Sequence, residues 1–582
     1  MKRIMSLVLV AVMLVGCMSV LSACGEPKND GAEISVYLGE EIYDFDPTEY
    51  LVDDNAEQVI SLLFDPLFTL NKKGKLKKDG AAEKYKVDKE ERKIVIELRE
   101  SYWSDEIRVT AEDYVYAWRD LLLEPTNSNP AAALLYDIEN AVEVKNGEMS
   151  LYELGVEASN TYEITITYRE GANYKQLLKN LASVATSPVR RDICTEFSAD
   201  YWTKLLNSAV TNGPFSIENI DYDAGAFTLV RNRGYHQKST VKDYTKIVNP
   251  YKLVSFTNNE GSEIKLSYSD IENKTVFFTT EATLADRAAN KDKAVTKDDL
   301  STYTYVFNTE RAAFANADVR RALSMAIDRN AIVNAITFGK AATGLIPDSV
   351  KGFRENSLIS GGAKLEDAKA IVDAAGLSAA DKKITLTVND DEQSVAIANL
   401  VKEAWDYIGF TVTVKPVSVK KSKITDFTNN EKIDISDSAI QYTVKAASRG
   451  DRDFDVIAVD WQMFTDDAFV ALAAFSTRYS GSGKIFSDKG NVALGSFGGY
   501  SNADYDALID KAFKSTDKDE RLAALRDAEK LLIETAAVAP IIYNQTFYFT
   551  NKEISKVSFN GFGNIVLNET KQKHYEDYYP EK

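Results

Sequence analysis

The stretch DVRRALSMAIDR, from Asp318 to Arg329, carries the clearest helical pattern in the 582-residue chain. Its apolar residues recur at the spacing of one helix face, and they are Val319, Ala322, Leu323, Ala326 and Ile327. The other face takes the charged residues Arg320, Arg321 and Arg329. We therefore predict one amphipathic helix over about 318–336, with Asn316 or Asp318 as its cap and Gly339 just beyond its end.

Helical and strand patterns alternate after this helix. A helical stripe ended by Gly376 consists of Leu365, Ala368, Val372 and Ala375. Alternation over 384–388 and 410–414 predicts two strands, and a helical stripe over 397–408, stopped by Gly409, lies between them. This order predicts a compact α/β lobe with its own core.

Two later segments depart from this alternation of helical and strand patterns. Residues 421–450 are polar and rich in Lys, Asp and Ser, which predicts a surface insertion. A helical stripe over 522–532 is followed by the apolar run 538–543, which we expect to be buried.

The amino-terminal residues have the pattern of an export signal. A basic start, Lys2 and Arg3, precedes an uncharged run from Ile4 to Ala23. Leu21-Ser22-Ala23-Cys24 has the order that a lipoprotein signal peptidase recognises, so we predict a signal peptide over 1–23 and a lipid on Cys24. Cys17 ends a second, less favoured match, and an uncleaved membrane anchor is the alternative to cleavage. Residues 24–32 would form a polar tether.

Cysteine content and charge restrict the possible partners. With Cys24 lipidated, only Cys194 remains in the mature chain, and we expect it to be a buried free thiol. The formal charge is −19, and removing the two positive charges Lys2 and Arg3 makes it −21. That balance argues against binding nucleic acid or anionic lipid by charge.

Catalytic and metal motifs are missing from the sequence. His236 and His574 are its two histidines, and no HExxH or CxxC motif occurs. The residues around each histidine in the sequence do not suit a catalytic base. We therefore expect a protein that is not an enzyme and has no metal or cofactor.

Five separated segments resemble the large bacterial solute-binding proteins of the oligopeptide/dipeptide/nickel type, extracellular family 5. They are Asp46-Pro47 with Leu63 to Phe68, then 94–119, then Asn212-Gly213-Pro214-Phe215 with 231–235, then Phe307-Asn308-Thr309 with 318–329, and finally Gly499 to Asn502 with Tyr505-Asp506. Two residues depart from the family pattern. Glu106 replaces a usual glycine, which predicts a different turn, and His236 replaces a common tryptophan.

The resemblance implies an α/β fold. We expect a two-lobed periplasmic-binding-protein-like clamp of type II, in the large peptide-binding subclass, with an extra inserted subdomain. Lobe I would combine 33–74, 195–304 and 541–582. The inserted subdomain would be 75–194, and lobe II would be 305–540. A ligand would lie between the lobes and be enclosed when they close.

The resemblance also implies where the ligand lies. In peptide-binding relatives an aspartate soon after a tryptophan pairs with the ligand's ammonium group, but alignment on Trp461 places Phe464 there. Asp466 or Asp460 would then supply the charge, unless a free amino terminus is not selected. The alternative role of Asp466, with Asp467, is to cap the helix that follows. Trp461 is either a pocket wall or a core residue. The complete set of expected ligand contacts is Val52, Asp53, Asn212, Trp461, Gln462, Phe464 and Asp466.

The predicted function is that of a lipid-anchored, extracytoplasmic and monomeric receptor that delivers peptides to the permease of an ABC importer. One alternative is a binder of another small solute, such as an oligosaccharide. Another is a peptide-sensing or chaperone-like surface lipoprotein.

Overall fold

A computed structural model describes residues 31–38, 45–48, 54–197, 209–221, 226–236, 248–255, 267–417, 420–426, 431–437, 454–481, 484–487, 490–493 and 496–577. The predicted signal peptide, Cys24, Val52 and Asp53 lie outside these ranges. Within them, no helix combines the length and the apolar character needed to cross a membrane. Gly31 and Ala32, the last two residues of the predicted tether, are buried, and the rest of that tether lies outside these ranges.

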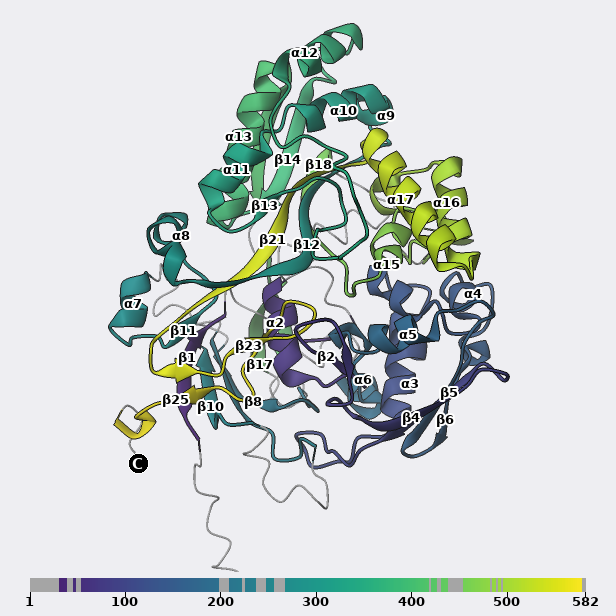
Figure 1. Cartoon of the computed structure of the whole chain (residues 1–582), viewed down its shortest axis with the longest axis vertical. Helices are drawn as coiled ribbons and strands as arrows, with labels where there is room; N and C mark the ends of the chain where they lie inside the picture. The colour runs from purple at the N-terminus through teal and green to yellow at the C-terminus, as the bar shows by residue number, and fades with distance from the viewer. Residues whose placement is uncertain are drawn as a thin grey trace, which may run out of the picture.

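Two lobes share one mixed sheet in the described part of the chain, in the order β15-β14-β18-β12-β21-β11-β1-β10-β9-β8, with β13 beside β21 (Figure 1). Its strands are β1 (Glu33–Tyr37), β8 (Phe215–Asp221), β9 (Ala226–Arg231), β10 (Lys252–Ser255), β11 (Phe278–Thr279), β12 (Val295–Phe307), β13 (Lys340–Ala341), β14 (Lys383–Asn389), β15 (Thr411–Val417), β18 (Val456–Gln462) and β21 (Val538–Thr550).

The antiparallel strands β12 and β21 run through both lobes and connect them (Figure 1). Thr304 pairs with Pro540, which is where the predicted lobe boundaries 304/305 and 540/541 fall. The pairing register shifts between Asp298 and Thr302, and such irregularities bend strands locally. These two strands therefore form the hinge region between the lobes.

The upper lobe, which contains β14, β15 and β18, is covered by helices and has the α/β alternation predicted from the sequence (Figure 1). The helices are α9 (Ala312–Ala315), α10 (Ala317–Met325), α11 (Arg329–Ile336), α12 (Leu365–Ala374), α13 (Glu392–Tyr407), α15 (Ala468–Ala473), α16 (Ala503–Lys514) and α17 (Lys518–Glu534). The apolar run 538–543 is buried in β21, as expected.

The single helix predicted over 318–336 is wrong, because the chain forms α10 and α11 with a break between them. Asp328 caps α11 by accepting the Ala331 N–H at 2.9 Å. Arg320 and Arg329 are buried, not on a solvent face. Arg329 donates to the carbonyls of Ser324, Ile327 and Pro540, so the guanidinium satisfies backbone groups that the break leaves open.

The lower lobe includes a separate four-stranded sheet in the order β4-β5-β7-β6. Its strands are β4 (Ala82–Asp88), β5 (Lys93–Leu98), β6 (Val156–Asn160) and β7 (Glu163–Thr167). Its helices include α2 (Asp54–Leu63), α3 (Ala111–Tyr116), α4 (Ala141–Lys145), α5 (Tyr174–Asn180), α6 (Arg191–Phe197), α7 (Tyr268–Glu272) and α8 (Leu284–Asn290). Every strand of this sheet lies within 75–194, where the inserted subdomain is predicted.

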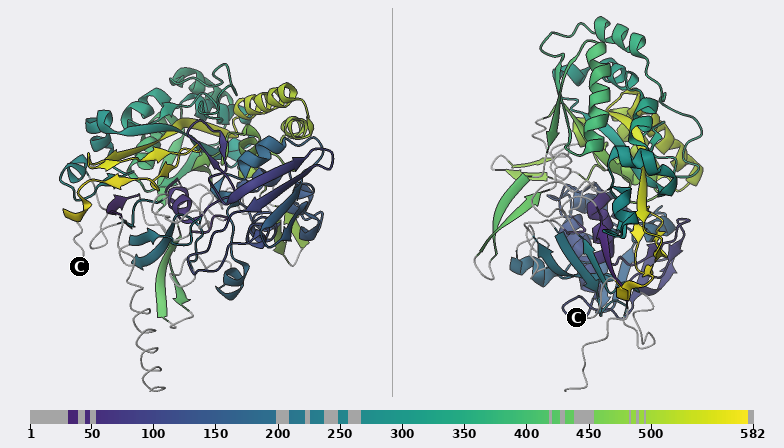
Figure 2. Two further views of the ribbon diagram at one scale, coloured as in Figure 1. Left: turned by 60° about the horizontal axis from the view of Figure 1, so that its bottom comes forward. Right: turned by 90° about the vertical axis from the view of Figure 1, so that its left-hand side faces the viewer.

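The structure describes residues to which three local predictions apply. Cys194 is buried and free, as expected. Within the predicted insertion 421–450, β16 (Lys420–Asp426) pairs with β17 (Glu431–Asp437) as a hairpin that projects from the body (Figure 2). Glu106 has φ +68°, the left-handed conformation that glycine favours.

Candidate ligand site between the lobes

Of the concave regions that the described residues form where the lobes meet, two adjoin strand β18 and the loop after it. The first, which we call the hinge cavity, has a volume of about 150 Å³ and lies against the crossing strands. It is lined by Gln58, Thr280, Glu281, Arg287, Asp299, Phe338, Gln393, Asp460, Asn544, Gln545, Thr546, Phe547, Asn564 and Ile565. The second, the outer groove, has a volume of about 730 Å³ and lies between α5, the 350–353 loop and the start of α17.

Strand β18 and the loop after it connect these two regions. Asp460 lines the hinge cavity, and Asp466 and Asp467 line the outer groove. The residues between them are buried, and the Met463 N–H donates to the Leu300 carbonyl at 3.0 Å. Residues 460–467 thus contribute acidic side chains to both concave regions, one to the hinge cavity and two to the outer groove.

Trp461 is a core residue in this conformation. It is 1 % exposed, and its indole N–H donates to the Ala471 carbonyl at 3.2 Å. Its ring centroid lies 5.2 Å from that of Phe475 and 5.0 Å from that of Phe497. Neither concave region is lined by Trp461 or by its buried neighbour Gln462.

Phe464 is buried and has φ +58°. A bulky residue is rare in this region, because its Cβ crowds the backbone at a cost of about 1–2 kcal/mol. Strained residues of this kind gather at binding sites, where the surrounding structure holds them in place. The backbone at the aligned clamp position is therefore tightly specified, although its side chain carries no charge.

Asp466 and Asp467 have different partners. Asp466 forms an ion pair with Lys179 on α5 and also accepts from Gln176 at 3.3 Å. Asp467 caps α15 by accepting the Phe469 N–H at 3.1 Å, and it pairs with Arg521 at 2.8 Å. The capping role considered for both residues therefore belongs to Asp467, and the charge of Asp466 already has a partner.

The Asn212 side chain forms hydrogen bonds with Asp65 within the lower lobe. Its side-chain oxygen accepts the Asp65 N–H at 3.0 Å, and its amide group donates to the Asp65 carbonyl at 3.1 Å. The Asp65 carboxylate lies 2.6 Å from Nε2 of His236, and both side chains are buried. These contacts fix a turn of the lower lobe, and none of the three residues lines either concave region.

Two buried carboxylates were missed by sequence reasoning. Glu57 on α2 accepts from the Asn564 side chain at 2.8 Å, and Asp299 on β12 accepts the Leu300 N–H at 2.6 Å. Burial raises the pKa of Glu57 from 4.5 to about 7, and burial likewise raises the pKa of Asp299 above its ordinary value. No sequence motif marks them, because they belong to segments that meet only in the fold.

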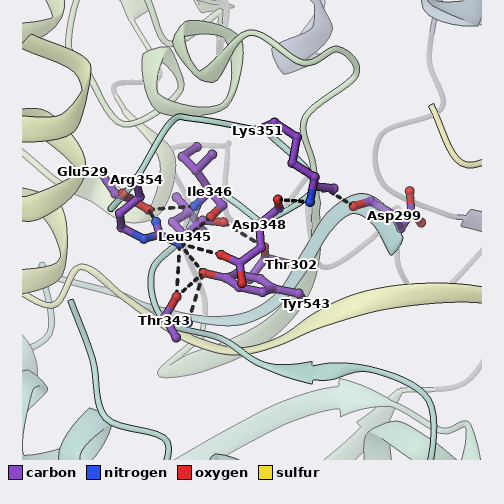
Figure 3. Close-up of polar contacts among 11 residues, drawn as sticks. Asp299, Thr302, Thr343, Leu345, Ile346, Asp348, Lys351, Arg354, Glu529 and Tyr543 are labelled. Atoms are coloured by element: carbon purple, nitrogen blue, oxygen red, sulfur yellow. Dashed lines mark hydrogen bonds and ion pairs between the residues drawn. The ribbon is translucent and has the colours of Figure 1, made fainter. Parts of the chain in front are cut away.

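A polar network holds the 343–354 loop beside the crossing strands (Figure 3). Arg354 forms an ion pair with the buried Glu529, contacts the Tyr543 hydroxyl, and donates to the Ile346 carbonyl at 2.8 Å. Glu529 also accepts the Ile346 N–H at 2.8 Å. The network positions residues 350–353, which form one wall of the outer groove.

Direct contacts join the lobes at the far side of the groove. Arg478 pairs with Glu143 at 2.9 Å and with Glu148 at 3.2 Å. Thr465 donates to the Asn180 side chain at 3.1 Å. Together with the Lys179–Asp466 pair, these contacts show that the two lobes touch.

Comparison with known proteins agrees with this architecture. The profile of "Bacterial extracellular solute-binding proteins, family 5 Middle" matches residues 78–483. The oligopeptide-binding protein OppA of Bacillus subtilis is 25 % identical over 94 % of this chain and 96 % of its own length.

Two solved structures show the same fold. The murein tripeptide binding protein MppA of Escherichia coli superposes with a TM-score of 0.75 at 23 % identity, covering 93 % of this chain and 99 % of its own. OppA of Haemophilus influenzae in complex with the peptide RPPGFSPFR gives a TM-score of 0.73 at 20 % identity, with the same coverage. The two-lobed fold and the family profile together establish that this chain belongs to the bacterial extracellular solute-binding proteins of family 5.

Proposed function

We propose that this chain captures peptides between its lobes and delivers them to an ABC importer as a monomeric, lipid-anchored receptor on the outer face of the cell membrane. The observation that carries the proposal is the path of β18 and its following loop, from the hinge cavity to the outer groove. Relatives of the same fold are named as oligopeptide- and tripeptide-binding proteins.

The chemistry of the cleft supports a polar, extended ligand. The hinge cavity is lined mainly by amide, carboxylate and hydroxyl side chains, which can pair with peptide groups. The outer groove extends this space beyond the 462–465 segment and offers room for further residues. Closure of the lobes would enclose such a ligand and present one conformation to a transporter.

Mass spectrometry of ligand that co-purifies with a soluble form starting after Cys24 tests the cargo. A mixture of peptides is the expected result. A single sugar or another non-peptide solute would reject the peptide assignment. That alternative is based on Phe464, whose side chain stands at the aligned clamp position and carries no charge.

Anchoring and delivery need separate tests. Cys24→Ala should move the protein from the membrane fraction to the medium, whereas Cys17→Ala should leave it on the membrane. Release by both variants or by neither would contradict a lipid on Cys24. Deleting the gene should reduce uptake of a labelled peptide that the purified protein binds; unchanged uptake would favour a sensing or chaperone-like role.

A further inference from the structure

The turn at Phe464 lies between two anchors, one in each lobe. On its amino-terminal side, the Met463 N–H donates to the Leu300 carbonyl at 3.0 Å, which continues the pairing of β18 with β12 in the upper lobe. On its carboxyl-terminal side, the Thr465 hydroxyl donates to the side-chain oxygen of Asn180 at 3.1 Å. Asn180 is the last residue of α5, which belongs to the lower lobe (Figure 1). The chain therefore passes from one lobe's contact to the other's across a single residue.

The interlobe hydrogen bond of Thr465 is shielded from water. Thr465 is 0 % exposed and Asn180 is 4 % exposed. The interlobe pair of Arg478 with Glu143, by contrast, is formed by partly exposed side chains. Water cannot replace a buried hydrogen bond, so its loss leaves polar groups unpaired. This bond is therefore sensitive to whether the lobes touch.

Asn180 is fixed within its own lobe. Its amide group donates to the Leu134 carbonyl at 3.0 Å, and its oxygen also accepts from Gln176, one turn earlier on α5, at 3.1 Å. The Gln176 amide nitrogen lies 3.2 Å from the Thr465 hydroxyl oxygen as well. A side chain with partners on both of its polar atoms cannot rotate without breaking a bond. Asn180 thus offers Thr465 an acceptor at a fixed position.

The backbone of Phe464 needs support on both sides. Its φ of +58° is a conformation that a bulky residue disfavours by about fivefold or more in population, unless the surroundings hold it. If the lobes move apart, the bond between Thr465 and Asn180 is broken and the anchor at Met463 remains. The turn then loses one of the two contacts that flank the strained residue.

We propose that Asn180 is a positioning residue for the ligand site: when the lobes touch, it holds Thr465 and thereby keeps the Phe464 backbone in its left-handed conformation. Asn180 itself lines neither the hinge cavity nor the outer groove. This inference rests on the proposed peptide-binding function and deepens it, because it makes the shape of a turn expected to face the ligand depend on contact between the lobes.

Such a coupling is reciprocal. A ligand that favours the Phe464 turn also favours the bond between Thr465 and Asn180, and with it the contact between the lobes. Glycine adopts a positive φ without strain, so a Phe464→Gly turn needs this bond less. A bond that only held the lobes together would contribute equally with either residue at position 464. Non-additivity with Phe464→Gly is therefore the signature of positioning.

Native mass spectrometry of the soluble protein with an equimolar pool of random pentapeptides measures the apparent Kd. Thr465→Val removes the hydroxyl at similar size and should raise the Kd by about three- to tenfold, as expected for a lost buried hydrogen bond. Asn180→Ala breaks the same bond from the other lobe and should do the same. Thr465→Ser keeps the hydroxyl and should stay within about twofold of the unaltered protein. In the Phe464→Gly background, the effect of Thr465→Val should fall below about twofold.

Arg478→Gln is the matched control, because it removes an interlobe ion pair elsewhere along the interface. Its effect on the Kd should be the same with phenylalanine or glycine at position 464. If the effect of Thr465→Val is also the same in both backgrounds, or if it leaves the Kd unchanged, the positioning role is overturned while peptide binding stands.

An unaltered protein that binds none of the pentapeptides would contradict the proposed function, and hydrogen exchange then decides the positioning role without a ligand. In Thr465→Val, segment 463–469 should exchange its amide hydrogens about threefold faster or more, because the turn has lost an anchor. Arg478→Gln should leave exchange in this segment unchanged. Equal exchange in Thr465→Val and the unaltered protein would overturn the role of Asn180.

Discussion

The Lys179 side chain on α5 forms an ion pair with the Asp466 carboxylate of the upper lobe, so a residue expected to hold the ligand joins the lobes instead. Its neighbours Gln176 and Thr465 are part of the same contact. The pair is partly exposed, and ion pairs of that kind contribute about 0.2–1 kcal/mol. This contact stabilises the arrangement in which the two lobes touch.

Asp466→Ala should therefore weaken the binding of free and acetylated peptides equally, by about two- to fivefold in Kd. The physical reason is that the substitution removes an interlobe contact and not a partner of the ligand's ammonium group. Isothermal titration calorimetry with matched peptides measures this effect. Lys179→Ala should have the same effect, and the double variant should be less than additive. Selective loss of free-amino peptides would assign Asp466 to the ligand.

Trp461→Ala should destabilise the fold by about 3–5 kcal/mol, since it leaves a cavity among the rings of Phe475 and Phe497 and an unpaired Ala471 carbonyl. Urea denaturation measures the free energy of unfolding. Trp461→Phe keeps most of the packing and should cost less. If stability is unchanged and only ligand affinity falls, Trp461 is a pocket wall.

Glu106→Gly should stabilise the protein by up to about 1 kcal/mol. Glycine has no Cβ and removes the strain of φ +68°, although it also gains entropy in the unfolded chain. Glu106→Ala is the matched control, because it removes the carboxylate and keeps the strain. Thermal denaturation of the two variants compares them. An equal gain in both would mean that charge and not backbone conformation is responsible.

Glu57→Gln should stabilise the ligand-free protein at pH 8 by on the order of 1–3 kcal/mol and have little effect at pH 4. The folded pKa of about 7 is above the ordinary 4.5, so wild-type stability falls as the pH rises through this interval. Glutamine stays neutral and can still accept from Asn564. Unfolding curves at both pH values measure the difference.

Glu355→Gln, an exposed site with a 79 % exposed side chain, is the control for the loss of one negative charge. It should show no pH-dependent gain. A Glu57→Gln variant that is no more stable than wild type at pH 8 would mean that the folded protein does not hold this carboxylate at a raised pKa.

Local patterns predicted most elements of the upper lobe. The stripes over 365–375, 397–408 and 522–532 became α12, α13 and α17, and the alternating segments became β14 and β15. Helix and strand periodicity depends on neighbours within a few residues, so it is readable without the fold. The family resemblance likewise depends on short ordered motifs, and the match over 78–483 confirms it.

What the sequence by itself determined is the order of these elements, the burial of Cys194 and the family. Only the tertiary structure decided that the 318–336 helix breaks. The break leaves backbone carbonyls without a helical partner, and the buried guanidinium of Arg329 donates to them. The same guanidinium also donates to Pro540 on β21, far away in the sequence. The tertiary structure also decided that Asp466 pairs with Lys179 and that Asp299 lines the hinge cavity. Charges act through space, and segments far apart in the chain come together only when the hinge strands pair.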